Sequence, residues 1–124
     1  MSLHQHRQFT QWVYDHLFEI ESFHHGDCIG SDHEAHEIVK DLIPVVVHPP
    51  LGATMRAFCE DGRRVITRQP SNYLTRNRDM VNECDVLVAT PLTDMSSTGG
   101  RIGGTWYTIR YAQKVGKEVF IIWR

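Results

Sequence analysis

Hydrophobic residues follow two alternating patterns along this chain. Apolar side chains that recur every three or four residues are typical of helices with one face against a core. This spacing predicts helices over residues 8–20, 31–43, 71–84 and 104–115. Short apolar runs without polar alternation are typical of strands covered on both faces. Such runs predict strands over residues 22–26, 44–50, 85–90 and 118–123.

The regular alternation of helix and strand indicates a fold class. Apolar strands separated by helices favour a parallel sheet with helices on both faces. We therefore predict an α/β fold, a Rossmann-like three-layer sandwich with a mostly parallel sheet of about four strands. Residues 51–70 are predicted to form a loop with one short irregular turn, and residues 91–101 a polar loop. The whole chain, residues 1–124, is expected to form one domain.

Composition and charge narrow the classes of partner. Of 124 residues, 41% are hydrophobic and 23% charged, and the net charge of -2 provides no basic surface for duplex nucleic acid. No long apolar run or signal-peptide pattern is present, so we expect no membrane association. The three cysteines form no CxxC pair, and their odd number fits reduced thiols in the cytoplasm.

Two glycine-rich turns follow predicted strands and lead into predicted helices. They are "GDCIGSD" (residues 26–32) and "GGT" (residues 103–105). A helix N-terminus presents unpaired N–H groups, and glycine lets an anion approach the backbone closely. Ligands of parallel sheets bind beyond the carboxyl ends of the strands. The two turns thus predict a phosphate-bearing ligand, although neither is a P-loop and each could instead be a tight connection.

Histidines are frequent near the first turn, which raises the question of a metal. His24 and His25 are adjacent on a strand and point to opposite faces, and His33 and His36 complete no HExxH or Cys/His set. We predict no metal and no cofactor. His36 is expected to pack under the glycine turn, and His33 to face solvent.

Arginine and aromatic side chains near the strand ends could contact a ligand. Arg76 could reach a phosphate by bidentate geometry, whereas Arg78 fits an exposed helix face with Asp79 and Glu83. Trp106 and Arg110 are four residues apart and could stack or flank a base, although burial against the sheet is the commoner fate of such a tryptophan. The serines and threonine at 96–98 have no recognisable triad partners.

Three motifs, "HGDCIGSDHEAH", "RNRDMVNECDVLVATP" and "GGTWYTIRYAQKVGKEVFII", occur in this order. Together they resemble the SLOG superfamily, the Rossmann-like group that includes the LOG "lysine decarboxylase-like" phosphoribohydrolases and DNA-processing protein A. The resemblance runs from Gln8 to near the end of the chain and is strongest to small stand-alone members. It implies a nucleotide-derived ligand whose phosphate lies between residues 30–32 and 103–105.

One departure from the LOG pattern concerns catalysis. LOG-type hydrolases carry a catalytic glutamate after the glycine-threonine turn, where this chain has Trp106, Tyr107 and Thr108. The arginine of the LOG "RKxxM" motif has a counterpart in Arg76. Only Asp27, Asp32 or His48 could supply acid/base chemistry instead.

We therefore favour a sensor or sequestering module that binds a nucleotide or nucleotide-derived phosphate ligand. The alternatives are an N-glycosidic phosphoribohydrolase acting on a nucleoside monophosphate and a non-binding structural subunit of a homo-oligomer. A homodimer or higher homo-oligomer is expected in addition. The predicted ligand-binding residues are Gly26, Asp27, Gly30, Ser31, Asp32, His48, Arg76, Gly103, Gly104, Thr105 and Trp106.

A second departure concerns the sheet. SLOG-like proteins usually open with a central strand and a glycine turn, whereas the first element predicted here is the helix that follows them. A gap at that place would leave backbone N–H and C=O groups unpaired, at about 1–3 kcal/mol for each buried group. We therefore expect the strands at 22–25 and 85–90 to pair directly with each other.

Overall fold

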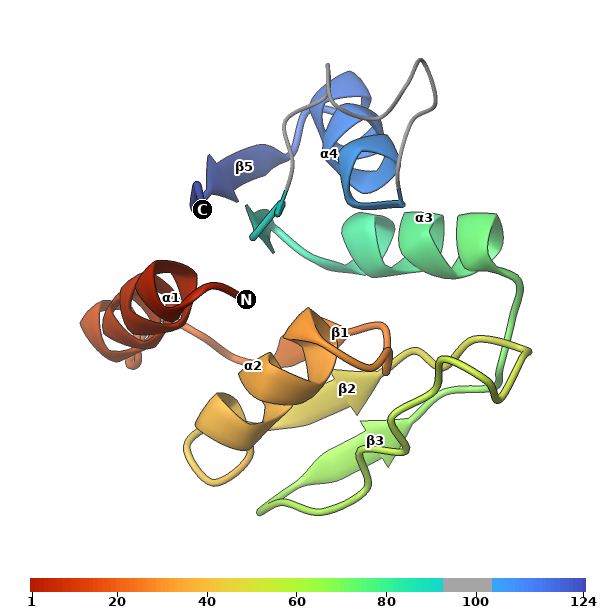
Figure 1. Ribbon diagram of the computed structural model, residues 1–124, viewed down its shortest axis with the longest axis horizontal. Helices are drawn as coiled ribbons and strands as arrows, with labels where there is room; N and C mark the ends of the chain where they lie inside the picture. The colour runs from red at the N-terminus through yellow and green to blue at the C-terminus, as the bar shows by residue number, and fades with distance from the viewer. Residues whose placement is uncertain (93–103) are drawn as a thin grey trace.

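The computed structural model describes residues 1–92 and 104–124 of the chain. Within them, helices and strands alternate for most of the length (Figure 1). The helices are α1 (Leu3–Asp15), α2 (Ser31–Val39), α3 (Tyr73–Glu83) and α4 (Gly104–Lys114). The strands are β1 (Phe23–His25), β2 (Val45–Val47), β3 (Val65–Thr67), β4 (Val86–Ala89) and β5 (Glu118–Ile121).

The strands form two parallel sheets rather than one. One sheet has the order β1-β2-β3, with Phe23 opposite Val45 and Val45 opposite Val65, and the other pairs β4 with β5. The predicted α/β class with parallel strands is confirmed, but the single sheet of about four strands is wrong. The sequence predicts a loop where strand β3 lies. Its three residues are half-buried or exposed, so the segment lacks the long apolar run that is typical of a buried strand.

Direct pairing of β1 with β4 is also wrong, and helix α1 provides the reason. Its Phe9 ring lies 5.6 Å from that of Phe23 in β1, and its Trp12 stacks at 6.3 Å on Phe120 in β5. A helix with side chains is about 10 Å wide. Because α1 packs on both sheets at once, it keeps their facing edges apart, and a cavity lies between β1 and β4.

Helix α1 starts five residues before the predicted position. Ser2 caps it through a capping box: Gln5 N–H donates to Ser2 Oγ at 3.1 Å, and Ser2 N–H donates to Gln5 Oε1 at 2.9 Å. The Gln5 amide nitrogen is fully buried and donates to the carbonyl oxygens of Pro91 and Ile122 at 2.8 and 3.0 Å. The start of α1 is thus tied to the carboxyl ends of β4 and β5.

The ends of the other helices follow from local hydrogen bonds. Asn72 caps α3 by accepting from Thr75 N–H. Gly116 has a φ of 80° and ends α4, with Gly116 N–H donating to the Gln113 carbonyl and Lys117 N–H to the Ala112 carbonyl. This arrangement is the Schellman motif, which favours glycine at that position.

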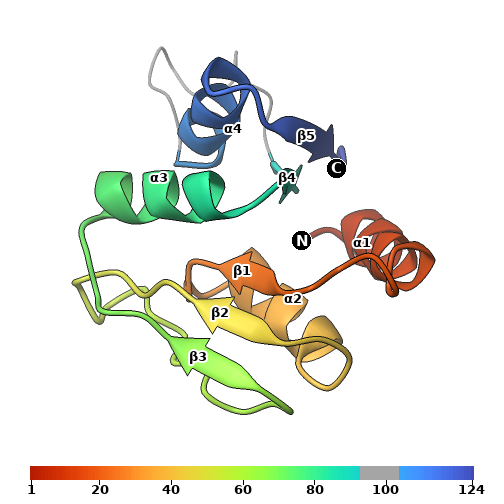
Figure 2. The same ribbon diagram turned by 180° about the vertical axis from the view of Figure 1, so that it is seen from behind.

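One apolar core joins α1 and α2 to the strands. Figures 1 and 2 show α2 on one face of the three-stranded sheet and α3 packed beside α4. The buried core residues are Phe9, Val13, Ala35, Val39, Ile43, Val45, Val47 and Ile122. Among the described residues, no helix is long and apolar enough to cross a membrane.

Candidate functional site

The first glycine-rich turn forms the start of α2, as predicted. Gly30 is the N-cap, and its φ of 107° is a backbone conformation that residues with a side chain rarely adopt. No side chain caps the helix. The Ser31 hydroxyl accepts a hydrogen bond from Thr90 Oγ1 at 3.3 Å. The N-terminus of α2 therefore lies beside the carboxyl end of β4, although the two belong to different parts of the sequence.

Arg76 lies beneath this turn, where it holds the ends of two strands. Its Nη1 donates to the carbonyl oxygens of Gly26, which follows β1, and of His48, which follows β2. Its Nε donates to Asn77 Oδ1 at 2.7 Å, and the side chain is buried. Sequence reasoning assigned Arg76 to the ligand phosphate. The structure instead directs its donors at protein groups, namely two backbone carbonyls, the Asn77 side chain and the Cys28 sulfur. Its charge therefore lies beneath the turn.

Asp27 and Asp32 were the acidic candidates for catalysis, and both are hydrogen-bonded inside the turn, where Asp27 is buried and Asp32 half-buried. Asp27 accepts from Cys59 N–H and from Arg56 Nε, each at 2.8 Å, and its φ of 57° is left-handed. Asp32 Oδ2 accepts from Cys28 N–H at 3.1 Å. Burial is the main influence on Asp32 and raises its pKa. Both carboxyl groups thus hold the loop together.

The second glycine-rich turn is described only from Gly104 onward, because Gly103 lies outside the described residues, as do residues 96–98. Gly104 begins α4 as predicted, and Gly104 and Thr105 are exposed. Trp106 is half-buried, with its ring 5.8 Å from that of Trp123. A Cβ on Gly104 would meet no described atom within 4 Å. Packing against the described residues therefore does not explain this glycine.

A cavity of about 480 Å³ separates β1 from β4. Ser31, Asp32 and Thr90 line it near the carboxyl ends of the strands, and Phe9, Trp12 and Val88 provide apolar wall. Cavities of roughly 300–1,000 Å³ with a few polar groups are typical of small-molecule sites. The uncapped start of α2 thus borders a space of ligand size.

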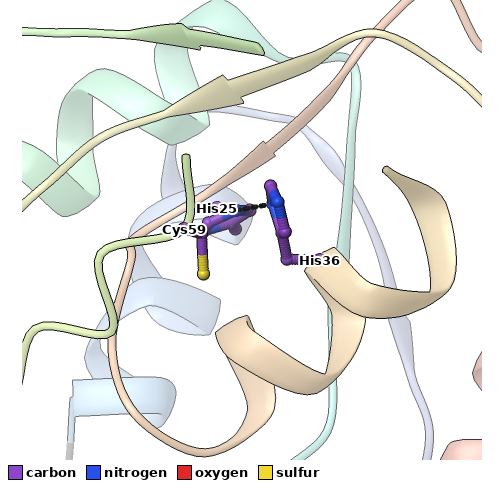
Figure 3. Close-up of side chains that lie close together, drawn as sticks. All are labelled: His25, His36 and Cys59. Carbon is purple, nitrogen blue, oxygen red and sulfur yellow. Dashed lines mark hydrogen bonds between the residues drawn. The ribbon is translucent and has the colours of Figure 1, made fainter. Parts of the chain in front are cut away.

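His25, His36 and Cys59 form a buried cluster on the α2 side of the three-stranded sheet, as Figure 3 shows. His36 Nε2 lies 2.6 Å from the carbonyl oxygen of Asp61, so this nitrogen must carry the proton and donate. His36 Nδ1 therefore accepts from His25 Nε2 at 2.9 Å. His25 Nδ1 in turn accepts from the backbone N–H of Asp27 at 3.0 Å.

This cluster is complete without a metal, because its ring nitrogens are already used in one chain of hydrogen bonds. Burial lowers the pKa of His25 to about 3 and raises the pKa of the Cys59 thiol to about 12, so both are neutral at pH 7. To bind a metal, His25 Nε2 would have to lose its proton. The hydrogen bond from Asp27 N–H to His25 Nδ1 keeps that proton on Nε2. As predicted, His36 packs under the first turn, and His33 is exposed.

His48 does not lie at the turn with the other predicted ligand residues. Its ring contacts His24, with His48 Nε2 2.8 Å from His24 Nδ1, on the sheet face opposite His25. Strand alternation and the register of β1 with β2 could have predicted this: His24 is opposite Val46, and His48 points to the same side as Val46.

Sequence reasoning also missed Gln5, Cys59 and Glu83. A signal existed only for Gln5, because the S-x-x-Q spacing from Ser2 is that of a capping box. The roles of Cys59 and Glu83 depend on where a loop and a helix end are placed in space.

Comparisons of this chain with protein-family models, with curated proteins and with solved structures gave no match.

Proposed function

We propose that this chain binds a nucleotide-derived ligand through its phosphate, as a sensor or sequestering module. In this proposal the phosphate contacts the N-terminus of α2 at residues 30–32, and residues 103–105 at the start of α4 contact the same phosphate. The base and sugar occupy the cavity between β1 and β4. The SLOG resemblance supports this proposal. We also propose a three-layer arrangement, a homo-oligomer and a cytoplasmic location for this chain.

The uncapped start of α2 at Gly30 is the observation that carries the proposal. The first N–H groups of a helix need partners, and no side chain provides one here. These groups lie at the edge of the cavity, beside the Thr90 hydroxyl. The Arg76 guanidinium beneath the turn adds positive charge.

Two features favour binding over hydrolysis. General acid/base catalysis needs a titratable group within hydrogen-bond reach of the substrate. Asp27 uses both carboxylate oxygens on Arg56 and Cys59, and burial lowers the pKa of His48 to about 4. Asp32 remains the acidic group nearest the proposed phosphate.

A thermal-shift screen tests the proposal. Nucleoside mono- and diphosphates and ADP-ribose are compared with the matching nucleosides, which lack phosphate. A ligand at a hundred times its Kd should add about 2.7 kcal/mol of stability. We expect only phosphate compounds to stabilise the protein. Loss of this stabilisation in Gly104→Val but not in Gly52→Val would locate the ligand at the start of α4. Gly52 is the matched control, because a Cβ there also meets nothing within 4 Å. The absence of stabilisation by every phosphate compound would overturn the proposal.

A further inference from the structure

Three side chains from separate elements converge on the sheet face opposite α2. His24 comes from the middle of β1, His48 directly follows β2, and Glu83 is the last residue of α3. His24 Nδ1 lies 2.8 Å from His48 Nε2, and His48 Nε2 lies 3.7 Å from Glu83 Oε2. The convergence places two imidazole nitrogens and a carboxylate oxygen around one point.

The outer atoms of these side chains are held by further contacts. His24 Nε2 lies 3.2 Å from the Ser22 hydroxyl, and Glu83 Oε1 accepts from Arg68 Nη2 at 2.8 Å. Metal-ligating histidines usually donate their second ring N–H to a neighbouring acceptor, and ligating carboxylates are usually hydrogen-bonded as well. Ser22 and Arg68 thus stand where the supporting groups of a metal site would stand.

The positions of the ring protons distinguish this cluster from the buried one formed by His25, His36 and Cys59. With its Nε2–H donating to Ser22, His24 presents the Nδ1 lone pair inward, and His48 can present its Nε2 lone pair without losing a backbone contact. Neutral imidazole is the form that binds metals.

We propose that His24 Nδ1, His48 Nε2 and Glu83 Oε2 form a binding site for a divalent cation of the zinc class. Two imidazoles and one carboxylate are a common ligand set for zinc, which prefers a tetrahedron. Zinc–ligand bonds near 2.05 Å give a tetrahedral edge of about 3.3 Å. The separations of 2.8 and 3.7 Å bracket that edge, and all three ligand atoms lie within 4.8 Å of one another, so side-chain adjustments would complete the tetrahedral face.

The three ligands leave one tetrahedral position for an oxygen from water or from a small molecule. Glu83 is 37% exposed at its side chain, so the cation could enter from solvent. His24 and Glu83 also line the cavity between β1 and β4. A cation here would carry positive charge to the part of that cavity away from Ser31.

The test is a titration of chelator-treated protein with Zn²⁺ alone, in competition with a chromophoric chelator. We expect one equivalent to bind. His24→Ala and Glu83→Gln should each weaken the Kd by at least roughly 100-fold, since each removes a ligand. His4→Ala and Glu118→Gln, which change exposed residues of the same types, should alter the Kd less than about twofold. Glu83→Gln preserves size on a partly exposed residue, so it keeps the test valid if His24→Ala does not fold.

Ring ¹⁵N shifts recorded with and without Zn²⁺ locate the bound ion. Coordination should shift His24 Nδ1 and His48 Nε2 and leave the rings of His25 and His36 unchanged. The proposal is overturned if no stoichiometric binding occurs, if both ligand variants bind as the unmodified chain does, or if the shifts fall on His25 and His36.

Discussion

Arg76 and Gly26 are in direct contact: the guanidinium donates to the Gly26 carbonyl oxygen and fills the space where a side chain on Gly26 would be. A Cβ at this position would lie 2.5 Å from Arg76 Nη1 and 3.1 Å from Asp32 Oδ2. The buried arginine is thus the reason that position 26 requires glycine, and the backbone φ of Gly26 is not. The same arginine ties the ends of β1 and β2, so the turn and the sheet depend on one side chain.

Gly26→Ala should therefore destabilise the fold. The methyl group would displace a buried guanidinium and leave the carbonyl oxygens of Gly26 and His48 without their donor, at roughly 2–3 kcal/mol in total. Urea unfolding followed by circular dichroism measures the difference. Gly52→Ala is the control, since a Cβ there meets nothing within 4 Å, and it should change stability by less than about 0.5 kcal/mol. Equal stability of the two variants would contradict this role for Arg76.

Much of the fold could be predicted from the sequence, because every helix carries a clear apolar spacing. Strand β3 could not, since Val65–Thr67 is short and mostly exposed. The separation of the sheets was also beyond prediction, because it depends on Phe9 and Trp12 of one helix packing on two different strands. In the site, glycine and helix-start signals located Gly30 correctly, whereas the burial of Arg76 depends on how closely two strand ends approach.

Gly104→Ala should raise stability slightly while it weakens any phosphate binding at the start of α4. Glycine is a poorer helix residue than alanine, and space is open around Gly104, so a gain of roughly 0.5 kcal/mol is expected. Urea unfolding without ligand and the thermal shift with ligand measure the two effects separately. A loss of stability without ligand would show that Gly104 serves packing, as the structural-subunit alternative requires.

Nucleoside monophosphates should not be hydrolysed at a measurable rate. The chain has no carboxylate directly after the "GGT" turn, and the oxygens of Asp27 are already bonded to Arg56 and Cys59. Chromatographic detection of free base over a long incubation tests this. Base release that persists through purification and disappears in Asp32→Asn would contradict it and favour the phosphoribohydrolase. Asp32→Asn is the better probe than a change at Arg76, whose loss would disturb the strand ends.

Acid should weaken the fold well above the pH at which surface carboxylates protonate. His25 has a pKa of about 3 when folded and 6.5 as a free side chain, so between these values only the unfolded chain binds the proton. Stability therefore falls as the pH drops from about 6.5 towards 3, by roughly 2–3 kcal/mol at pH 4.5 from this ring alone. The raised pKa of Asp32 acts in the opposite direction and offsets part of the loss.

Urea unfolding at pH 7 and pH 4.5 measures the net change. Ring ¹⁵N shifts in the folded protein provide a separate check, since His25 should remain neutral at pH 4.5. A protonated His25 ring in the folded protein at that pH would contradict the hydrogen-bond chain from Asp27 to Asp61.

The cavity between the sheets should leave specific backbone amides without a partner. In β1, Phe23 N–H bonds to Pro44 and the His25 carbonyl accepts from His48, so the intervening His24 N–H points away from β2 towards β4. By the same alternation, Ala89 faces β5 through Ile122, and Val88 N–H points towards β1.

Hydrogen exchange should therefore be fast at His24 and Val88 and slow at Phe23 and Ile122. For a domain with a stability of about 5 kcal/mol, a paired core amide exchanges on the order of 10³-fold more slowly than an unpaired one. Amide-resolved exchange by NMR compares neighbours in the same strand, which removes differences in local sequence environment. Equally slow exchange at His24 and Phe23 would mean that the edge of β1 has a hydrogen-bond partner in solution. Repeating the measurement across protein concentrations then separates closure within one chain, which does not depend on concentration, from pairing with a second copy, which does.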